Sequence, residues 1–176
     1  MNNLLYLFKY PSDDNKGVVK TDSALIYRFK NRALTHIVHR FDFSVSKQLT
    51  NEKKCYVCDN AFVRHVSTKV GIDKGWLLEN LVAARLVATG SELFYFSGRK
   101  ECDFITIREK GIESVYQVCW ELDQSNEKRE MAGLLDAIKH TGLSGGIILT
   151  GDQEGERTIG DKLIRIIPVW KWMMEG

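Results

Sequence analysis

Residues 75–121 read GWLLENLVAARLVATGSELFYFSGRKECDFITIREKGIESVYQVCWE, and this stretch decides the fold. Its first part is an apolar run that ends at Gly90, a residue type common at helix C-termini, and Asp73 precedes the run as a candidate N-cap. The remainder holds ELFYFS, CDFITIRE and ESVYQVCWE, which are rich in aromatic and β-branched residues and are separated by SGRK and KG turns. We therefore expect a helix followed by three consecutive strands.

Polar residues interrupt this stretch where a purely structural core would be apolar. Glu79 shares its helical face with apolar residues three, four and seven positions further along, so its carboxylate lies along apolar surface and needs a partner. Asp103 stands in the middle of the second strand, although aspartate is among the residues that strands favour least. Gln117 and Cys119 are two apart in the third strand, which places both side chains on one face.

The remaining sequence completes an alternating pattern of helices and strands. Residues 126–141 carry apolar side chains at helical spacing and are followed by Gly142, which predicts an amphipathic helix. GGIILTG predicts a buried parallel strand, KLIRIIPVWKW predicts a last strand with a terminal helical turn, and GDQEGERTIGD predicts a polar hairpin loop between them. Upstream, KCYVC predicts a strand, whereas residues 1–40 show no sustained period and are interpreted as short strands or an irregular helix. This order indicates an α/β fold.

The helical Glu, the strand Asp and the two-apart polar pair resemble the PD-(D/E)XK pattern of the restriction-endonuclease-like fold. More narrowly, DKGWLLENLV, ECDF, YQVCWEL and IIPVWKW resemble the C-terminal domain that follows a P-loop ATPase in many bacterial and archaeal AAA+ proteins. The resemblance runs from about Phe43 to Met173. It implies a mixed central sheet flanked by helices at 43–176, with an N-terminal arm at 1–42 where the family has a winged-helix-like segment.

The resemblance also implies roles for the polar residues. Asp103 matches the family's metal-binding aspartate and Glu79 its helical glutamate, so these two are the candidate Mg²⁺ ligands. Gln117 stands where the family often has a second strand carboxylate, and Cys119 stands where it has a lysine. An amide oxygen can bind Mg²⁺ but carries no charge, and a thiol with an ordinary pKa near ~8.5 supplies no fixed cation at neutral pH.

Nearby residues could replace the two lost charges. Glu121 has the same strand parity as Gln117 and could restore a carboxylate, while Arg129 or Lys128 on the following helix could supply a cation. Two functions therefore stay open. The first is a catalytically degenerate accessory domain of an ATPase system that docks a AAA+ module or associates with DNA, and the second is a Mg²⁺-dependent nuclease with migrated active-site residues. A non-functional remnant is a third interpretation.

Because two of the pattern's four functional residues are replaced, we expect the degenerate domain and no metal-dependent cleavage of DNA. The polar residues would then form a buried network that fixes the helix on the sheet. The chain has no GxxxxGKS/T motif, so it is not itself the ATPase.

Composition and charge restrict the class of protein. The 176 residues, 44% of them hydrophobic, suffice for one core, and no apolar run is long enough for a membrane span. The N-terminus lacks a basic leader and a cleavage site, so we expect a cytoplasmic protein without membrane contact. Residues 1–70 hold 12 Lys and Arg against 6 Asp and Glu, whereas residues 71–176 hold 13 against 17. A basic arm beside an acidic body could bind phosphates or pack on the body itself.

Several residues suggest chemistry but are better explained by packing. Cys55 and Cys58 form a CxxC pair, but strand alternation sends their thiols to opposite faces, which disfavours zinc. His36 and His39 could share one face of a helix, yet no third ligand is evident nearby. Trp120 could stack on a nucleobase, but strand alternation directs it away from the polar face, so we expect it to cap the core.

Overall fold

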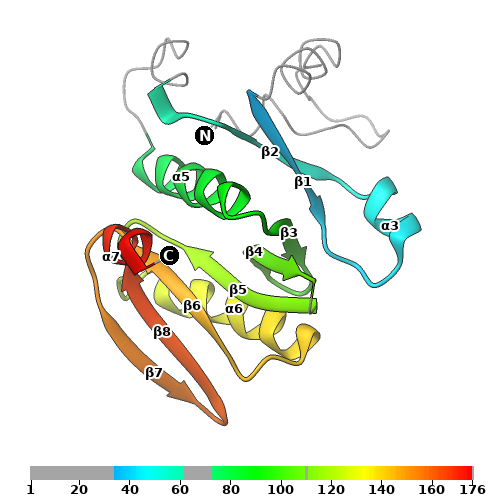
Figure 1. Ribbon diagram of the computed structural model, residues 1–176. Coiled ribbons are helices and arrows are strands. Elements are labelled where there is room, and N and C mark those ends of the chain that lie inside the picture. Colours follow the sequence, from blue (N-terminus) through cyan, green and yellow to red (C-terminus); the bar gives the residue numbers. More distant parts are fainter. Residues whose placement is uncertain (1–33, 62–72, 110, 176) are drawn as a thin grey trace.

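The computed structural model describes residues 34–61, 73–109 and 111–175. They form a mixed eight-stranded sheet in the order β2-β1-β3-β4-β5-β6-β8-β7, with helices packed on both faces (Figure 1). The elements in chain order are β1 (Thr35–Arg40), α3 (Val45–Thr50), β2 (Lys53–Val57), α5 (Lys74–Ala88), β3 (Glu92–Ser97), β4 (Glu101–Arg108), β5 (Gly111–Val118), α6 (Glu127–Thr141), β6 (Gly145–Thr150), β7 (Gly155–Ile159), β8 (Lys162–Pro168) and α7 (Val169–Glu175). The predicted α/β class, a mixed sheet flanked by helices, is confirmed.

The centre of the sheet follows the predicted order. β3, β4 and β5 pair antiparallel through their short turns, and β5 then pairs parallel with β6 after the chain crosses through α6. Apolar side chains alternate between the two faces, so Phe104 packs in the cluster that contains α5, and its neighbour Ile105 packs in the cluster that contains α6. Asp103 and Gln117 lie on adjacent paired strands, and α5 packs on this sheet, as predicted.

The termini of both long helices lie where the sequence predicts them. Asp73 caps α5, because its carboxylate accepts a hydrogen bond from the Trp76 N–H at 3.1 Å, and Gly90 follows the helix at a φ of +79°. Gly142 closes α6 at a φ of +78°. Within α6, Gly133 allows a close approach to β4, because a Cβ at this position would lie 2.1 Å from the Glu101 carbonyl oxygen. This approach brings the first turns of α6 to the polar residues of β4 and β5.

The structure corrects two expectations of local structure. The segment interpreted as a polar loop between β6 and β8 contains a strand, β7, which pairs antiparallel with β8 at the sheet edge. β7 is almost entirely exposed, so it lacks the apolar alternation that reveals a strand in a sequence. His36 and His39 lie in β1, not in a helix, and their side chains therefore do not share a face. His39 Nδ1 instead lies 3.2 Å from the Gln48 carbonyl oxygen of α3.

The described part of the predicted arm belongs to the sheet. β1 pairs with β2 on one side and, in parallel, with β3 on the other, although it precedes the expected domain start at Phe43. Residues 1–33 of the arm, and most of the short helix and loop expected before Ile72, lie outside the described residues. None of the described helices is long and apolar enough to cross a lipid bilayer.

Candidate active site

A polar cleft opens where β5 ends, between the N-terminal turns of α5 and α6. Its volume is about 670 Å³. Four elements contribute its walls: the start of α5, the start of β4, the end of β5 with the residues after it, and the start of α6. The lining residues are Asp73, Gly75, Trp76, Glu79, Lys100, Glu101, Asp103, Gln117, Val118, Cys119, Trp120, Glu121, Asn126, Arg129 and Glu130. The predicted site residues Glu79, Asp103, Gln117, Cys119, Glu121 and Arg129 are all among them.

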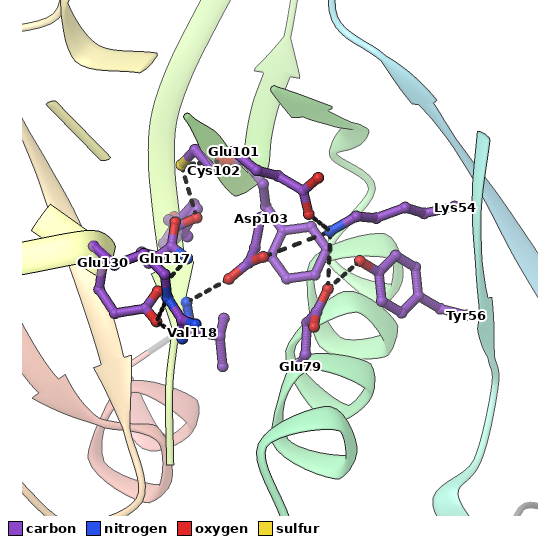
Figure 2. A network of polar contacts seen from close by, with 12 residues as sticks. Lys54, Tyr56, Glu79, Glu101, Cys102, Asp103, Gln117, Val118 and Glu130 are labelled. Atoms are coloured by element: carbon purple, nitrogen blue, oxygen red, sulfur yellow. Dashed lines mark hydrogen bonds and ion pairs between the residues drawn. The ribbon is translucent and has the colours of Figure 1, made fainter. Parts of the chain in front are cut away.

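A lysine from β2 lies beside the carboxylates of this cleft. Lys54 Nζ is 2.7 Å from Glu101 Oε1, 3.3 Å from Glu79 Oε1 and 3.6 Å from Asp103 Oδ1 (Figure 2). Its side chain is only 12% exposed. Burial works against the ammonium, but the negative charges of the surrounding groups, Glu79 foremost, outweigh it and raise the pKa of Lys54 well above its usual value. Lys54 is therefore a fixed cation.

Asp103 is buried beside this ammonium. Its Oδ2 accepts a hydrogen bond from the Val118 backbone N–H at 2.8 Å, which orients the carboxylate toward the end of β5. Burial and the neighbouring charge of Glu79 raise the pKa of Asp103 to about 8, while Lys54 and the Val118 N–H act in the opposite direction. The ionisation of Asp103 therefore depends on the cations near it.

Tyr56 fixes the orientation of Glu79. The Tyr56 hydroxyl donates a 2.5 Å hydrogen bond to Glu79 Oε1, the same oxygen that lies near Lys54. Tyr56 and Lys54 are two residues apart in β2 and so share one strand face. Burial raises the pKa of Tyr56 well above its usual value, so its hydroxyl keeps its proton and remains a donor.

Gln117 bonds to a glutamate of α6 rather than to Asp103. Its Nε2 donates a 2.7 Å hydrogen bond to Glu130 Oε2, and both side chains are buried. Glu130 Oε1 is paired with Arg129, whose Nε lies 3.0 Å away. Gln117 Oε1 is buried and faces α6, 3.5 Å from where a Gly133 Cβ would lie, and no group of the described residues donates a hydrogen bond to it. The expected single polar network is thus divided into two neighbouring groups. Lys54 joins Glu79 and Asp103 in one, and Glu130 joins Gln117 and Arg129 in the other.

The residues considered as replacements have different positions. Cys119 lies just past the end of β5, and burial raises the pKa of its thiol to about 12, so it supplies no charge. Glu121 lines the exposed rim of the cleft. Arg129 also lies at the rim, 73% exposed, and it pairs with Glu130, whereas Lys128 does not line the cleft. Neither expected replacement cation lies in the position that Lys54 occupies.

Sequence reasoning missed Lys54 and Glu130. Lys54 precedes the site by a long stretch of chain, and only its alternation with Tyr56 in the predicted KCYVC strand links it to a buried face. Glu130 lies four residues before Leu134 and so on the apolar face of α6, an unusual position for a carboxylate. The prediction for Trp120 was wrong for a simple reason: β5 ends at Val118, so strand alternation no longer applies, and Trp120 lines the same cleft as Gln117.

Carboxylate oxygens are the donor atoms that the cleft offers to a divalent cation. Within residues 34–61, 73–109 and 111–175, no three His, Cys, Asp or Glu side chains surround a single point as metal ligands would. Three carboxylates surround the Lys54 ammonium instead. Their oxygens are the hard ligands that Mg²⁺ prefers, and Asp103 makes only a long contact to Lys54. The oxygens of Asp103 and Glu79 therefore suit Mg²⁺ and these two residues would hold it, but among the described residues no third side chain completes a set of metal ligands.

Comparison with known proteins gives one informative relative. The uncharacterized protein MJ1544 from Methanocaldococcus jannaschii is 34% identical to this chain over 144 residues, which is 76% of the chain and 32% of the relative. The chain thus spans about a third of the relative's length. No family model matches the chain, and no solved structure matches it.

Proposed function

We propose that this domain is a Mg²⁺-dependent phosphodiesterase that acts on nucleic acid and has a restriction-endonuclease-like core. The arrangement of its elements supports the proposal: a helix with a glutamate, two antiparallel strand pairs, a crossover helix and a parallel strand follow one another as α5, β3, β4, β5, α6 and β6. The single observation that carries it is the Lys54 ammonium, which lies within 3.6 Å of Asp103 beside an open cleft. A cation from β2 thus replaces the lysine missing at Cys119.

The charges of the cleft support a role for a divalent cation. Six acidic side chains and two basic ones, Lys100 and Arg129, line the cleft. The formal net charge of these side chains stays negative when the nearby Lys54 is included. Such a cleft repels the phosphates of a nucleic acid unless further positive charge is bound. Mg²⁺ held by Asp103 and Glu79 would neutralise charge on a phosphate oxygen and acidify a water molecule.

The chain's own residues would act around that cation. Lys54 keeps its proton and can donate a charge-assisted hydrogen bond to a phosphate oxygen. Tyr56 holds Glu79, and the Val118 N–H holds Asp103, so both carboxylates are oriented before a substrate enters. Arg129 and Lys100 at the rim can bind phosphates that flank the reacting one.

A second function is a docking module without chemistry. The observation that favours it is that both oxygens of the Glu130 carboxylate are already bonded within the chain, to Gln117 and to Arg129. The match to a relative three times as long supports a role beside other domains, and a AAA+ ATPase module is the partner that the resemblance implies. In this case nucleic acid would bind, if at all, outside the acidic cleft.

Metal binding and cleavage, measured on the same samples, distinguish these functions. Isothermal titration with Mg²⁺ or Mn²⁺ and cleavage of plasmid and single-stranded DNA should both give signals for the wild type. Asp103→Asn, which keeps the shape of the side chain, should lose both. Glu127→Gln, a change at an exposed carboxylate of α6 outside the cleft lining, is the control and should retain both. A wild type that binds no metal and cleaves nothing supports the docking module.

A further inference from the structure

Trp120 is an exposed aromatic residue inside the candidate active-site cleft. It lies two residues after the end of β5, it is 46% exposed, and it lines the cleft together with Asp103 and Gln117. A tryptophan that caps a core would bury most of its large apolar surface. Trp120 therefore does not cap the core, and nearly half of its surface is open at the cleft.

The backbone and one side of the ring are held in place. The Gly151 N–H donates a 2.9 Å hydrogen bond to the Trp120 carbonyl oxygen. A Cβ at Gly151 would lie 3.3 Å from the indole Cε2, so the ring packs closely against the glycine backbone. A fixed aromatic ring loses little conformational entropy when a ligand stacks on it.

A flexible cation lies over the ring. Lys74 Nζ is 5.0 Å from the centroid of the Trp120 ring, and Lys74 is itself exposed at the first position of α5. An exposed cation–π contact contributes only about 0.5–1 kcal/mol, so a flat ligand can displace the ammonium at small cost. The displaced ammonium would remain near the ring, where it can bind an anionic group of the same ligand.

We infer that Trp120 stacks on an unpaired nucleobase, with Lys74 bound to an adjoining phosphate, so that the substrate has a single-stranded segment at the cleft. This inference deepens the proposed function and rests on it for the presence of nucleic acid in this cleft. A π-face is what every base offers once it is unstacked, whereas the faces of bases in a duplex are covered by their neighbours. Trp120 and Asp103 line one cleft, which places the base beside the candidate reacting phosphate.

The test is equilibrium binding of fluorescent oligonucleotides, followed by anisotropy with Ca²⁺ in place of Mg²⁺. The probes are oligo-dT, oligo-rU, a DNA strand of equal length with abasic sites, and a blunt duplex. Trp120→Ala should weaken binding of the single strands at least about fivefold, and Trp120→Phe should retain most of the affinity. Trp170→Ala is the matched control, because Trp170 is 53% exposed but lies outside the cleft lining.

The abasic strand keeps the phosphates and lacks the stacking groups, so wild type and Trp120→Ala should bind it equally. A preference between oligo-dT and oligo-rU identifies DNA or RNA as the source of the base. Equal affinity of Trp120→Ala and wild type for both single strands, or tighter binding of the duplex, overturns the inference. Strand cleavage that Trp120→Ala leaves unchanged also overturns it while the proposed function stands. Trp120-dependent binding without any cleavage has the opposite meaning: it supports the inference and contradicts the phosphodiesterase.

Discussion

Lys54 Nζ lies 3.6 Å from Asp103 Oδ1, although β2 and β4 are separated in the sheet by β1 and β3. The contact forms because Lys54 and Tyr56 of β2 share the face of the sheet that α5 covers, where the Tyr56 and Phe104 rings are 5.4 Å apart. The ammonium thereby reaches Glu79 and Glu101 as well. The charge state of the candidate active site thus depends on a residue of the N-terminal hairpin.

Replacing Lys54 should destabilise the fold in a pH-dependent way. Lys54→Met removes the cation beside Asp103 and Glu79, a change expected to cost about 3 kcal/mol of unfolding free energy at about pH 9, where Asp103 of the wild type is ionised. Because the pKa of Asp103 is already raised in the fold, its ionisation lowers stability as the pH rises, and loss of Lys54 raises that pKa further. The destabilisation should therefore be larger at about pH 9 than at about pH 6.

Urea unfolding at the two pH values measures this difference. Lys128→Met, which removes an exposed ammonium from α6 outside the cleft lining, should change stability by less than about 0.5 kcal/mol at both. A Lys54→Met effect that is independent of pH would mean that Asp103 does not titrate against this cation.

Cleavage by the wild type should rise with pH. Asp103 must lose its proton to hold a cation, and its pKa is raised to about 8 by burial and by Glu79, so the rate should increase between about pH 6 and about pH 9. Raising the Mg²⁺ concentration should move the midpoint to lower pH, because the metal ion and the proton compete for one carboxylate. Initial rates over a pH series at two Mg²⁺ concentrations check this. A midpoint that does not move with Mg²⁺ argues against Asp103 as a ligand.

The hydrogen bond between Gln117 and Glu130 should be exchangeable. Gln117→Glu places a second carboxylate against Glu130 in a buried position and removes the amide donor, which should cost about 2–4 kcal/mol. Adding Glu130→Gln exchanges donor and acceptor and should recover more than half of the loss. A double-mutant cycle from urea unfolding gives the coupling energy. If the two losses simply add, the 2.7 Å contact does not contribute to stability.

Gly133 should tolerate no side chain. Gly133→Ala puts a Cβ 2.1 Å from the Glu101 carbonyl oxygen, so α6 must move away from β4, at a cost of about 3 kcal/mol or more. The same movement separates Glu130 from Gln117 and should impair any cleavage. Gly155→Ala in β7 is the control, because the nearest atom to its Cβ would be Arg157 Nη1 at 3.7 Å, and its effect should be small. Thermal unfolding of both variants is the measurement.

The sequence predicts the core of the fold because its signals there are local. Hydrophobic period, turn residues and caps such as Asp73, Gly90 and Gly142 mark α5, α6 and the central strands without knowledge of the rest of the chain. β7 has no such signal, since its side chains face solvent on both sides. Solvent-exposed edge strands depend on pairing with a neighbour, which single-sequence reasoning does not supply.

The candidate site is predictable only in part for a related reason. Glu79, Asp103 and Gln117 stand out because each is polar in an apolar setting of its own element. The partner of Asp103 does not, because the contact with Lys54 depends on how β2 and β4 pack against α5, a matter of tertiary structure. Arg129 and Glu121 were near enough in sequence to be considered, whereas Lys54 was not. Charge in a site can come from any element that reaches it, so spacing along the chain is a weak guide.

We propose that Lys54 replaces the missing lysine of a metal-dependent phosphodiesterase. The most direct measurement is the initial rate at which a labelled single-stranded oligonucleotide is cleaved with Mn²⁺ or Mg²⁺ at about pH 8.5, for wild type, Lys54→Met and the control Lys128→Met. We predict metal-dependent cleavage by the wild type and by Lys128→Met, and a rate about 10²–10³ lower for Lys54→Met at temperatures where it remains folded. No cleavage by the folded wild type, or full activity of Lys54→Met, would contradict the claim.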